Sequence, residues 1–185
     1  MIYVHQVLLG LDFLHSQGVI HRDIKGDNIL TTKDGEIKLA DFGVSVMLEQ
    51  TMTCGESKHI SFAGTPFWMA PEVIQGETVT AASDIWSLGC TIIELLTGKP
   101  PYFELNQYTA MTKIVNEKSP PIPKDISDQL RDFLQLCFEK EPSRRISAKG
   151  LLKHEWMGQV EKESLIQEII QMNGSSLNLL PESIT

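Results

Sequence analysis

The stretch from Ile85 to Leu96 constrains this fold more than any other part of the sequence, because most of its residues are apolar. It follows Ser83-Asp84 and ends at Gly98 and Pro100-Pro101, which are helix start and stop signals. A helix that is apolar around its whole circumference must be surrounded by other elements. We therefore expect this helix at the centre of one folded unit, and 185 residues with 42% apolar content suffice for its core.

Other segments predict shorter elements around that helix. Apolar residues recur at helical spacing from Ile2 to Ser16, and Gly18 supplies a left-handed helix end. Two β-prone runs, Asn28–Thr31 and Glu36–Leu39, flank Lys33-Asp34-Gly35, which predicts a hairpin. Residues 44–70 lack steady periodicity and predict a long functional loop. Further helices are expected at Asn106–Val115, Ser127–Glu139 and Ser147–Leu152.

The composition excludes several classes of protein. A net charge of −8 argues against binding to nucleic acid or to an anionic membrane surface, and it suits basic peptide substrates. Cys54, Cys90 and Cys137 are too widely spaced for a disulfide framework or a zinc pattern, which favours a reducing compartment. No apolar run is long enough to cross a membrane, and no signal segment opens the chain. We expect a soluble, cytoplasmic protein without membrane insertion.

Three motifs in order carry the chemistry. The string from His21 to Asn28 reads H-R-D-I-K-G-D-N, Asp41 opens D-F-G, and Ala70-Pro71-Glu72 follows downstream. The first matches the H-R-D-x-x-x-x-N catalytic loop of protein kinases and the second matches their metal-binding D-F-G loop. By these motifs the chain resembles the catalytic domain of a eukaryotic Ser/Thr protein kinase.

The resemblance implies a mainly α fold: the large lobe of a kinase, a helical bundle with short β-hairpins at the catalytic cleft. It covers residues 1–157, and we expect residues 158–185 to form a C-terminal extension, with a helix near 161–172 and a mobile end. A kinase also needs a Gly-rich loop and a strand lysine ahead of the catalytic loop. Neither occurs in residues 1–20, so the chain resembles a kinase whose small lobe is absent.

The kinase template, a worked case of phosphoryl transfer, implies the roles of the motif residues. Asp23 would accept and orient the substrate hydroxyl, since a carboxylate can hold that oxygen in line with the γ-phosphorus of ATP. Asn28 and Asp41 would coordinate Mg²⁺, which takes oxygen ligands. The Lys25 ammonium would reach the γ-phosphate, and lysine at this position favours Ser/Thr over Tyr specificity. Leu30 would floor the adenine pocket; the alternative is an ordinary strand core residue.

Residues 41–72 resemble an activation segment, with Gly64 to Glu72 close to the G-T-P-x-W-M-A-P-E pattern. The template implies that Thr65 hydrogen-bonds near Asp23 and shapes the peptide-binding loop. Ser61 lies where many kinases carry an activating phosphate, and the Arg22 guanidinium suits such a phosphate. We hypothesise that phosphorylation of Ser61 orders this loop. The weaker candidates are Thr51, Thr53 and Ser57.

Three further residues are expected to hold the site together. Glu72 would form a buried ion pair with Arg145, with Arg144 as the competing partner. Asp84 matches the family carboxylate that caps the catalytic-loop backbone from the central helix. An alternative for Asp84 is a plain helix N-cap, which would lie in a similar place.

Finer details narrow the resemblance. Gly26 in the catalytic loop is typical of MAP kinase kinase kinases and their sterile-type relatives. The segments 31–35, 81–91 and 113–123 are most similar to epsilon-type MAP kinase kinase kinases and septation-initiation kinases. The resemblance implies intracellular signalling and a protein substrate, for which another kinase is a candidate. It also implies activation by an upstream kinase or by autophosphorylation. The alternative is a non-catalytic chain that acts as a binding or decoy module, because these 185 residues are expected to be inactive alone.

Overall fold

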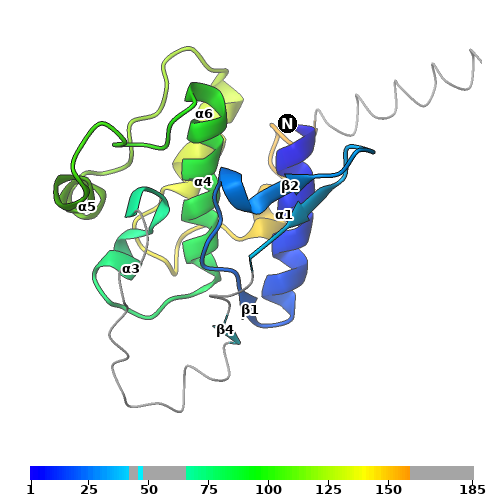
Figure 1. The fold of residues 1–185 in the computed structure, drawn as a ribbon, viewed down its shortest axis with the longest axis horizontal. Helices are drawn as coiled ribbons and strands as arrows, with labels where there is room; N and C mark the ends of the chain where they lie inside the picture. Colours follow the sequence, from blue (N-terminus) through cyan, green and yellow to red (C-terminus); the bar gives the residue numbers. More distant parts are fainter. Residues whose placement is uncertain (42–45, 48–65, 159–185) are drawn as a thin grey trace, which may run out of the picture.

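The computed structural model describes residues 1–41, 46–47 and 66–158, and Figure 1 shows their arrangement. The elements are mainly helical, with two pairs of short strands beside the first helix. The expected mainly α fold is therefore confirmed. The expected helix at 161–172 and the mobile end after it lie outside the described residues.

The central helix is α4, which spans Ala81–Thr97. Every residue from Ser83 to Ile93 is buried, as its apolar circumference predicts. The helix begins earlier than expected because Thr80 caps it: the Thr80 hydroxyl accepts from Ala82 N, and Ser83 completes a capping box. Gly98 closes it in the left-handed conformation, with φ 78°.

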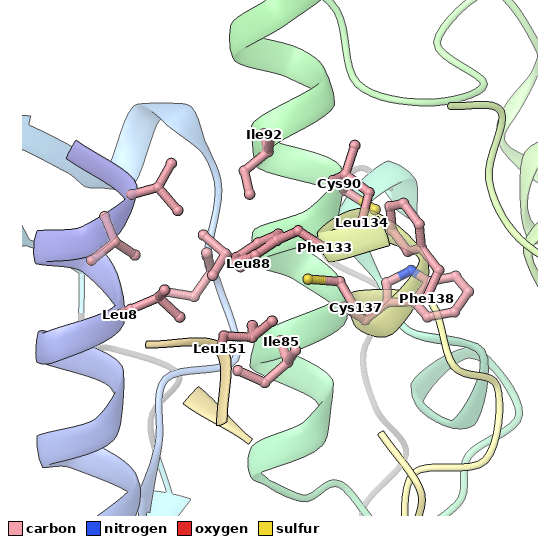
Figure 2. Close-up of a cluster of buried hydrophobic side chains, with 14 of the residues drawn as sticks. Leu8, Ile85, Leu88, Cys90, Ile92, Phe133, Leu134, Cys137, Phe138 and Leu151 are labelled. Atoms are coloured by element: carbon pink, nitrogen blue, oxygen red, sulfur yellow. The ribbon is translucent and has the colours of Figure 1, made fainter. Parts of the chain in front are cut away.

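The hydrophobic core forms where α4 meets α1 (Ile2–Ser16) and α6 (Asp128–Cys137). Figure 2 shows Leu8 of α1 facing Leu88 and Ile85 of α4, with Phe133 of α6 on the other side. The Trp86 ring lies edge-to-face against Phe138, with 5.1 Å between centroids. The core is thus one continuous cluster that surrounds the central helix.

The helix α1 also supports the first hairpin. Strands β2 (Ile29–Thr31) and β3 (Ile37–Leu39) pair antiparallel around a turn in which Gly35 has φ 80°, so the expected hairpin is confirmed. The Gln6 side-chain oxygen of α1 accepts from Ile37 N at 2.8 Å. Gly18, with φ 70°, ends α1 and leads into β1 (Val19–Ile20). Strand β1 pairs with β4 (Val46–Met47), which the sequence does not signal.

Three of the remaining helices begin at a polar cap, close to where the sequence predicts them. The side chains of Asn106, Ser127 and Ser147 each accept a backbone N–H in the first turn of the helix that follows. Helix α6 ends at Cys137, two residues before the expected Glu139. The other elements are the short helices η1 (Gly26–Asn28) and η3 (Pro66–Trp68), and the α-helices α3 (Pro71–Ile74), α5 (Gln107–Asn116) and α7 (Ala148–Leu151).

The two cysteines among the described residues, Cys90 and Cys137, are free thiols in the core. Burial raises the pKa of both thiols, which keeps them protonated and unreactive. No helix within the described ranges has the length and apolar content needed to cross a membrane.

We predict that Gly89→Ala destabilises this core. A Cβ at Gly89 would lie 2.8 Å from Phe138 Cε1 and 3.0 Å from Cys137 Cβ. Overpacking of this kind costs about 1–3 kcal/mol of unfolding free energy, which urea denaturation measures. The matched control is Gly158→Ala, where an added Cβ meets nothing within 4 Å. Equal effects of the two substitutions would contradict the packing described here.

Candidate active site

The catalytic loop is fastened to the central helix through one carboxylate. Asp84, fully buried in α4, accepts from the backbone N–H of His21 at 2.9 Å and of Arg22 at 2.8 Å. The ring Nε2 of His15, at the end of α1, lies 2.8 Å from the same carboxylate. Thr80 holds the N-cap position of α4, so Asp84 is not a plain helix cap. It caps the catalytic-loop backbone, as the resemblance implies.

The loop backbone is strained where Asp84 holds it. Arg22 has φ 71°, a left-handed conformation that non-glycine residues rarely adopt. Such a conformation costs about 1–3 kcal/mol and persists only where surrounding contacts fix it. The two hydrogen bonds to Asp84 supply that constraint, because they fix the amide of the strained residue and the amide of the residue before it. The strain therefore sets the direction in which the chain continues to Asp23.

Three motif side chains meet around the carboxylate of Asp23. Lys25 Nζ donates to Asp23 Oδ2 at 2.7 Å, and Asn28 Nδ2 donates to the same oxygen at 2.8 Å. Asn28 Nδ2 also donates to the Asp23 backbone carbonyl at 2.7 Å. Asn28 is buried, whereas Asp23 and Lys25 are half-buried. One oxygen of the Asp23 carboxylate thus accepts from the Lys25 ammonium and from the Asn28 amide. The carboxylate is fixed by these bonds and is partly open to solvent.

A buried histidine connects this loop to the segment that carries Asp41. The Nε2 atom of His21 lies 3.1 Å from the carbonyl of Ala40, and Asp23 N donates to His21 Nδ1 at 3.3 Å. A carbonyl only accepts, so these contacts assign the proton of the neutral ring to Nε2. Ala40 N in turn donates to Asn28 O at 2.9 Å. Asp41 follows directly, exposed and with φ 62°, at the edge of the catalytic loop.

The structure describes only some of the other residues expected at the nucleotide and regulatory sites. Leu30, on β2, is 53% exposed, so it is not an ordinary strand core residue. Ser61, Thr65 and the weaker phosphorylation candidates lie outside the described residues, as do Phe42 and Cys54. The described part of the chain contains no group of three His, Cys, Asp or Glu side chains placed to hold a metal ion.

Arg22 is a half-buried cation in this loop. Within the described residues, its buried Nε has no hydrogen-bond partner. Burial lowers the pKa of the Arg22 guanidinium, and the nearby Asp84 carboxylate opposes that shift. A guanidinium remains charged in either case. Within the part of the chain that the structure describes, the site thus holds a partly desolvated cation with one unused donor.

The expected ion pair between Glu72 and Arg145 is present and buried. Arg145 Nη1 donates to Glu72 Oε1 at 2.7 Å and Nη2 donates to Oε2 at 3.0 Å, which is a bidentate pair. The remaining guanidinium hydrogens go to three backbone carbonyls, those of Ala82, Glu139 and Lys140. All five donors of the guanidinium are therefore used. Arg144, the competing partner, is exposed.

Sequence reasoning missed two residues that organise the site. Glu94, on α4, accepts from the backbone of Gly26 and from the indole of Trp68. His15 joins α1 to Asp84. Glu94 carries a signal that the sequence does contain: it is an acid within an otherwise apolar run. A charge in such a run needs partners, because a buried, unpaired carboxylate is costly.

Comparison with known proteins agrees with this geometry. A family model described as "Protein kinase domain" matches residues 2–157. The chain is 58% identical over 156 residues to cytokinesis protein sepH of Emericella nidulans, covering 84% of this chain and 11% of that protein. It is 56% identical over 156 residues to MAP3K epsilon protein kinase 2 of Arabidopsis thaliana, covering 84% of this chain and 11% of that kinase.

A third relative is a probable serine/threonine-protein kinase of Dictyostelium discoideum, 52% identical over 155 residues, which cover 83% of this chain and 30% of that protein. The chain thus spans less than a third of the length of each of these relatives. The chain belongs to the protein kinase family, and its relatives are of the MAP kinase kinase kinase and septation type that the sequence predicts.

We predict that Arg145→Leu lowers the free energy of unfolding by about 3–5 kcal/mol, because it leaves the buried Glu72 carboxylate without its partner. Arg144→Leu is the matched control: the residue is adjacent but exposed, so its effect is expected within about 0.5 kcal/mol. Urea denaturation of both variants makes the comparison. A cost at Arg144 equal to that at Arg145 would contradict the pairing.

Proposed function

We propose that this chain supplies the catalytic residues of a protein kinase that transfers the γ-phosphate of ATP to Ser or Thr hydroxyls. One observation carries the proposal: Lys25 and Asn28 converge on a single oxygen of Asp23. Among the described residues, this leaves the other carboxylate oxygen of Asp23 to accept and orient a substrate hydroxyl. Positioning of this kind is the main protein contribution to phosphoryl transfer, which needs little covalent help.

The residues fit a magnesium–nucleotide complex on the chemistry of their donors. Asn28 Nδ2 donates to Asp23, and these bonds fix the plane of the Asn28 amide. The side-chain oxygen of Asn28 is then the atom available as a metal ligand. Asp41 would add a carboxylate oxygen from the segment anchored through Ala40. Mg²⁺ favours oxygen ligands and, when bound with ATP, neutralises charge on the transferred phosphoryl group. Lys25 would hold the γ-phosphate as a cation, and the exposed Leu30 would contact the base.

A measurement of kinase activity distinguishes two candidate functions of this chain. The 185 residues contain no Gly-rich loop and no strand lysine, so we expect little turnover from them alone. A binding or decoy module is the second candidate, and exposed apolar residues on α1 favour it: Ile2, Leu9 and Phe13 are each at least 50% exposed. The first reading requires that a small lobe restores activity, whereas the second does not.

We predict that joining a small lobe from an active kinase in front of these 185 residues gives Mg-ATP-dependent phosphorylation of a basic Ser-containing peptide. Asp23→Asn in this completed kinase is expected to lower kcat by about 10²-fold or more. Asp34→Asn, the same change in the exposed hairpin turn, is the matched control and should leave kcat unchanged. Radiolabel transfer measures all three. A completed kinase with no activity, or one that Asp23→Asn does not impair, would contradict the proposed function.

We further infer that phosphate on Ser61 activates the kinase. The desolvated Arg22, with its Nε unpartnered among the described residues, supports a phosphate site beside the catalytic loop. A phosphoserine brings up to two negative charges and three acceptor oxygens, which match a guanidinium. The phosphate would come from an upstream kinase or from autophosphorylation. The substrate would be a protein, and likeness to the relatives makes another kinase a candidate. The widely spaced cysteines support a reducing, cytoplasmic site of action. The net charge of −8 supports the absence of a nucleic-acid partner.

We predict that Ser61→Ala lowers the kcat of the phosphorylated, completed kinase by roughly ten- to a hundredfold, because the peptide-binding loop loses its charged anchor. Ser57→Ala, in the same loop, is the control and should cost less than about threefold. Peptide phosphorylation before and after phosphatase treatment measures the effect. Full activity of Ser61→Ala would show that another residue, or none, carries the switch.

A further inference from the structure

The hairpin β2–β3 carries both candidate metal ligands at its open end. Asn28 comes directly before β2, and Asp41 follows β3 after one intervening residue, Ala40. The backbone N–H of Ala40 donates to the carbonyl of Asn28 at 2.9 Å, which closes this end of the hairpin. The place of the two candidate ligands in the site therefore depends on what holds the hairpin as a whole.

The hairpin needs support from outside itself. Its two strands have three residues each, and an isolated two-stranded hairpin is only marginally stable in water. The side chains of Leu30 and Lys38, which pair across the hairpin, are exposed, so their face gains no support from the described residues. The other face, made of Ile29, Ile37 and Leu39, packs against the core cluster beside α1 (Figure 1). The support for the hairpin is therefore α1.

Gln6 of α1 binds the hairpin near its turn. Its side-chain oxygen accepts from Ile37 N at 2.8 Å, and its side-chain nitrogen donates to the carbonyl of Gly35 at 3.5 Å. Glu36 and Ala40 make backbone bonds across to the other strand, so the alternation of an antiparallel ladder points the N–H of Ile37 away from β2. The half-buried Gln6 amide supplies the acceptor that this outward N–H lacks within the hairpin.

A second residue on the same face of α1 brings the other end of β3 close to the helix. Gly10 lies one helical turn after Gln6, and residues at this spacing share a face. A Cβ built on Gly10 would lie 3.2 Å from Leu39 Cδ1, closer than most real Cβ contacts. Gly10 has no positive φ, so the close approach of β3 is what favours glycine here. Gln6 and Gly10 thus hold β3 at its two ends, Ile37 and Leu39.

We propose that Gln6 is a positioning residue for the metal–nucleotide site: by fixing β3 on α1, it sets the place of Asn28 and Asp41, the residues that would hold Mg²⁺. This inference rests on the proposed kinase function. Gln6 acts through the hairpin, so the role requires no contact of Gln6 with metal or nucleotide. The competing role for the same residue is support of folding alone, without an effect on metal binding in the folded protein.

Two substitutions separate these roles. Gln6→Met removes both hydrogen bonds and keeps the length of the side chain, whereas Gln6→Glu keeps an acceptor for Ile37 N. Positioning predicts that Gln6→Met weakens the contribution of Mg²⁺ to nucleotide binding and that Gln6→Glu restores it. A role in folding alone predicts that Gln6→Met lowers the unfolding temperature and leaves the contribution of Mg²⁺ unchanged.

The experiment measures equilibrium binding of a fluorescent ATP analogue to the completed kinase, once with Mg²⁺ and once with EDTA. The ratio of the two Kd values isolates the contribution of the metal, because a contact of Leu30 with the base affects both Kd values alike. We expect Gln6→Met to lower this ratio about three- to tenfold, the factor that one net hydrogen bond contributes to an equilibrium, and Gln6→Glu to stay within about twofold of the parent.

Gln17→Met is the matched control: it makes the same change just after α1, where the exposed glutamine side chain donates to the neighbouring Ser16 hydroxyl. It should leave the ratio unchanged. The KM for peptide should also stay unchanged in Gln6→Met, because α4 holds the Trp68 segment through Ser87. Thermal unfolding of each variant shows that it is folded.

Gln6→Asn withdraws the same amide from β3 by one methylene, and it serves if Gln6→Met does not fold. We expect it to lower the ratio by a comparable factor. An unchanged ratio in a folded Gln6→Met or Gln6→Asn, an equal loss in Gln6→Glu, or an equal loss in Gln17→Met would each overturn the inference. A ratio near one in the parent would overturn the metal site itself, and the role of Gln6 with it. An unimpaired Asp23→Asn would instead count against the kinase function.

Discussion

The buried Asp84 carboxylate is the interaction on which the rest of this structure depends. It lies inside the central helix, fully removed from solvent, and it binds two successive backbone amides of the catalytic loop and a histidine from α1. These contacts hold Arg22 in its strained, left-handed conformation. That conformation directs the chain so that Asp23, Lys25 and Asn28 meet. Through the buried Asp84 carboxylate, the rigid helix α4 thus fixes the conformation of the catalytic loop.

The same helix reaches the other parts of the site through different residues. Ser87 and Glu94 hold the η3 segment, Glu94 also holds η1, and the carbonyl of Ala82 accepts from Arg145, which binds Glu72. Each contact uses a polar group on a helix that is otherwise buried among apolar side chains. Burial strengthens these interactions, and it makes each unpaired partner expensive. The apolar circumference of α4 and its few polar groups therefore serve one purpose: they give the surrounding loops a fixed reference frame.

Local signals predicted much of the fold. The bounds of α1 follow from its apolar spacing and Gly18, and the hairpin follows from Asp34-Gly35 between two β-prone runs. The starts of α5, α6 and α7 follow from their polar caps. The predicted start of α4 is too late, because the Thr80–Ser83 capping box extends the helix beyond its apolar run. The pairing of β1 with β4 had no local signal, since two-residue strands depend on long-range contact.

The sequence by itself determined the family, the catalytic motif and the candidate roles of Asp23, Asn28 and Asp41, because these depend on residue types at fixed spacing. It also favoured Arg145 over Arg144 as the partner of Glu72. Only the tertiary structure decided that Asp84 caps the loop rather than its own helix, that His15 shares that carboxylate, and that Glu94 joins Gly26 to Trp68. These contacts join residues far apart in the chain. Sequence periodicity does not reveal which residues form such hydrogen bonds, because the partners come together only when the helices pack.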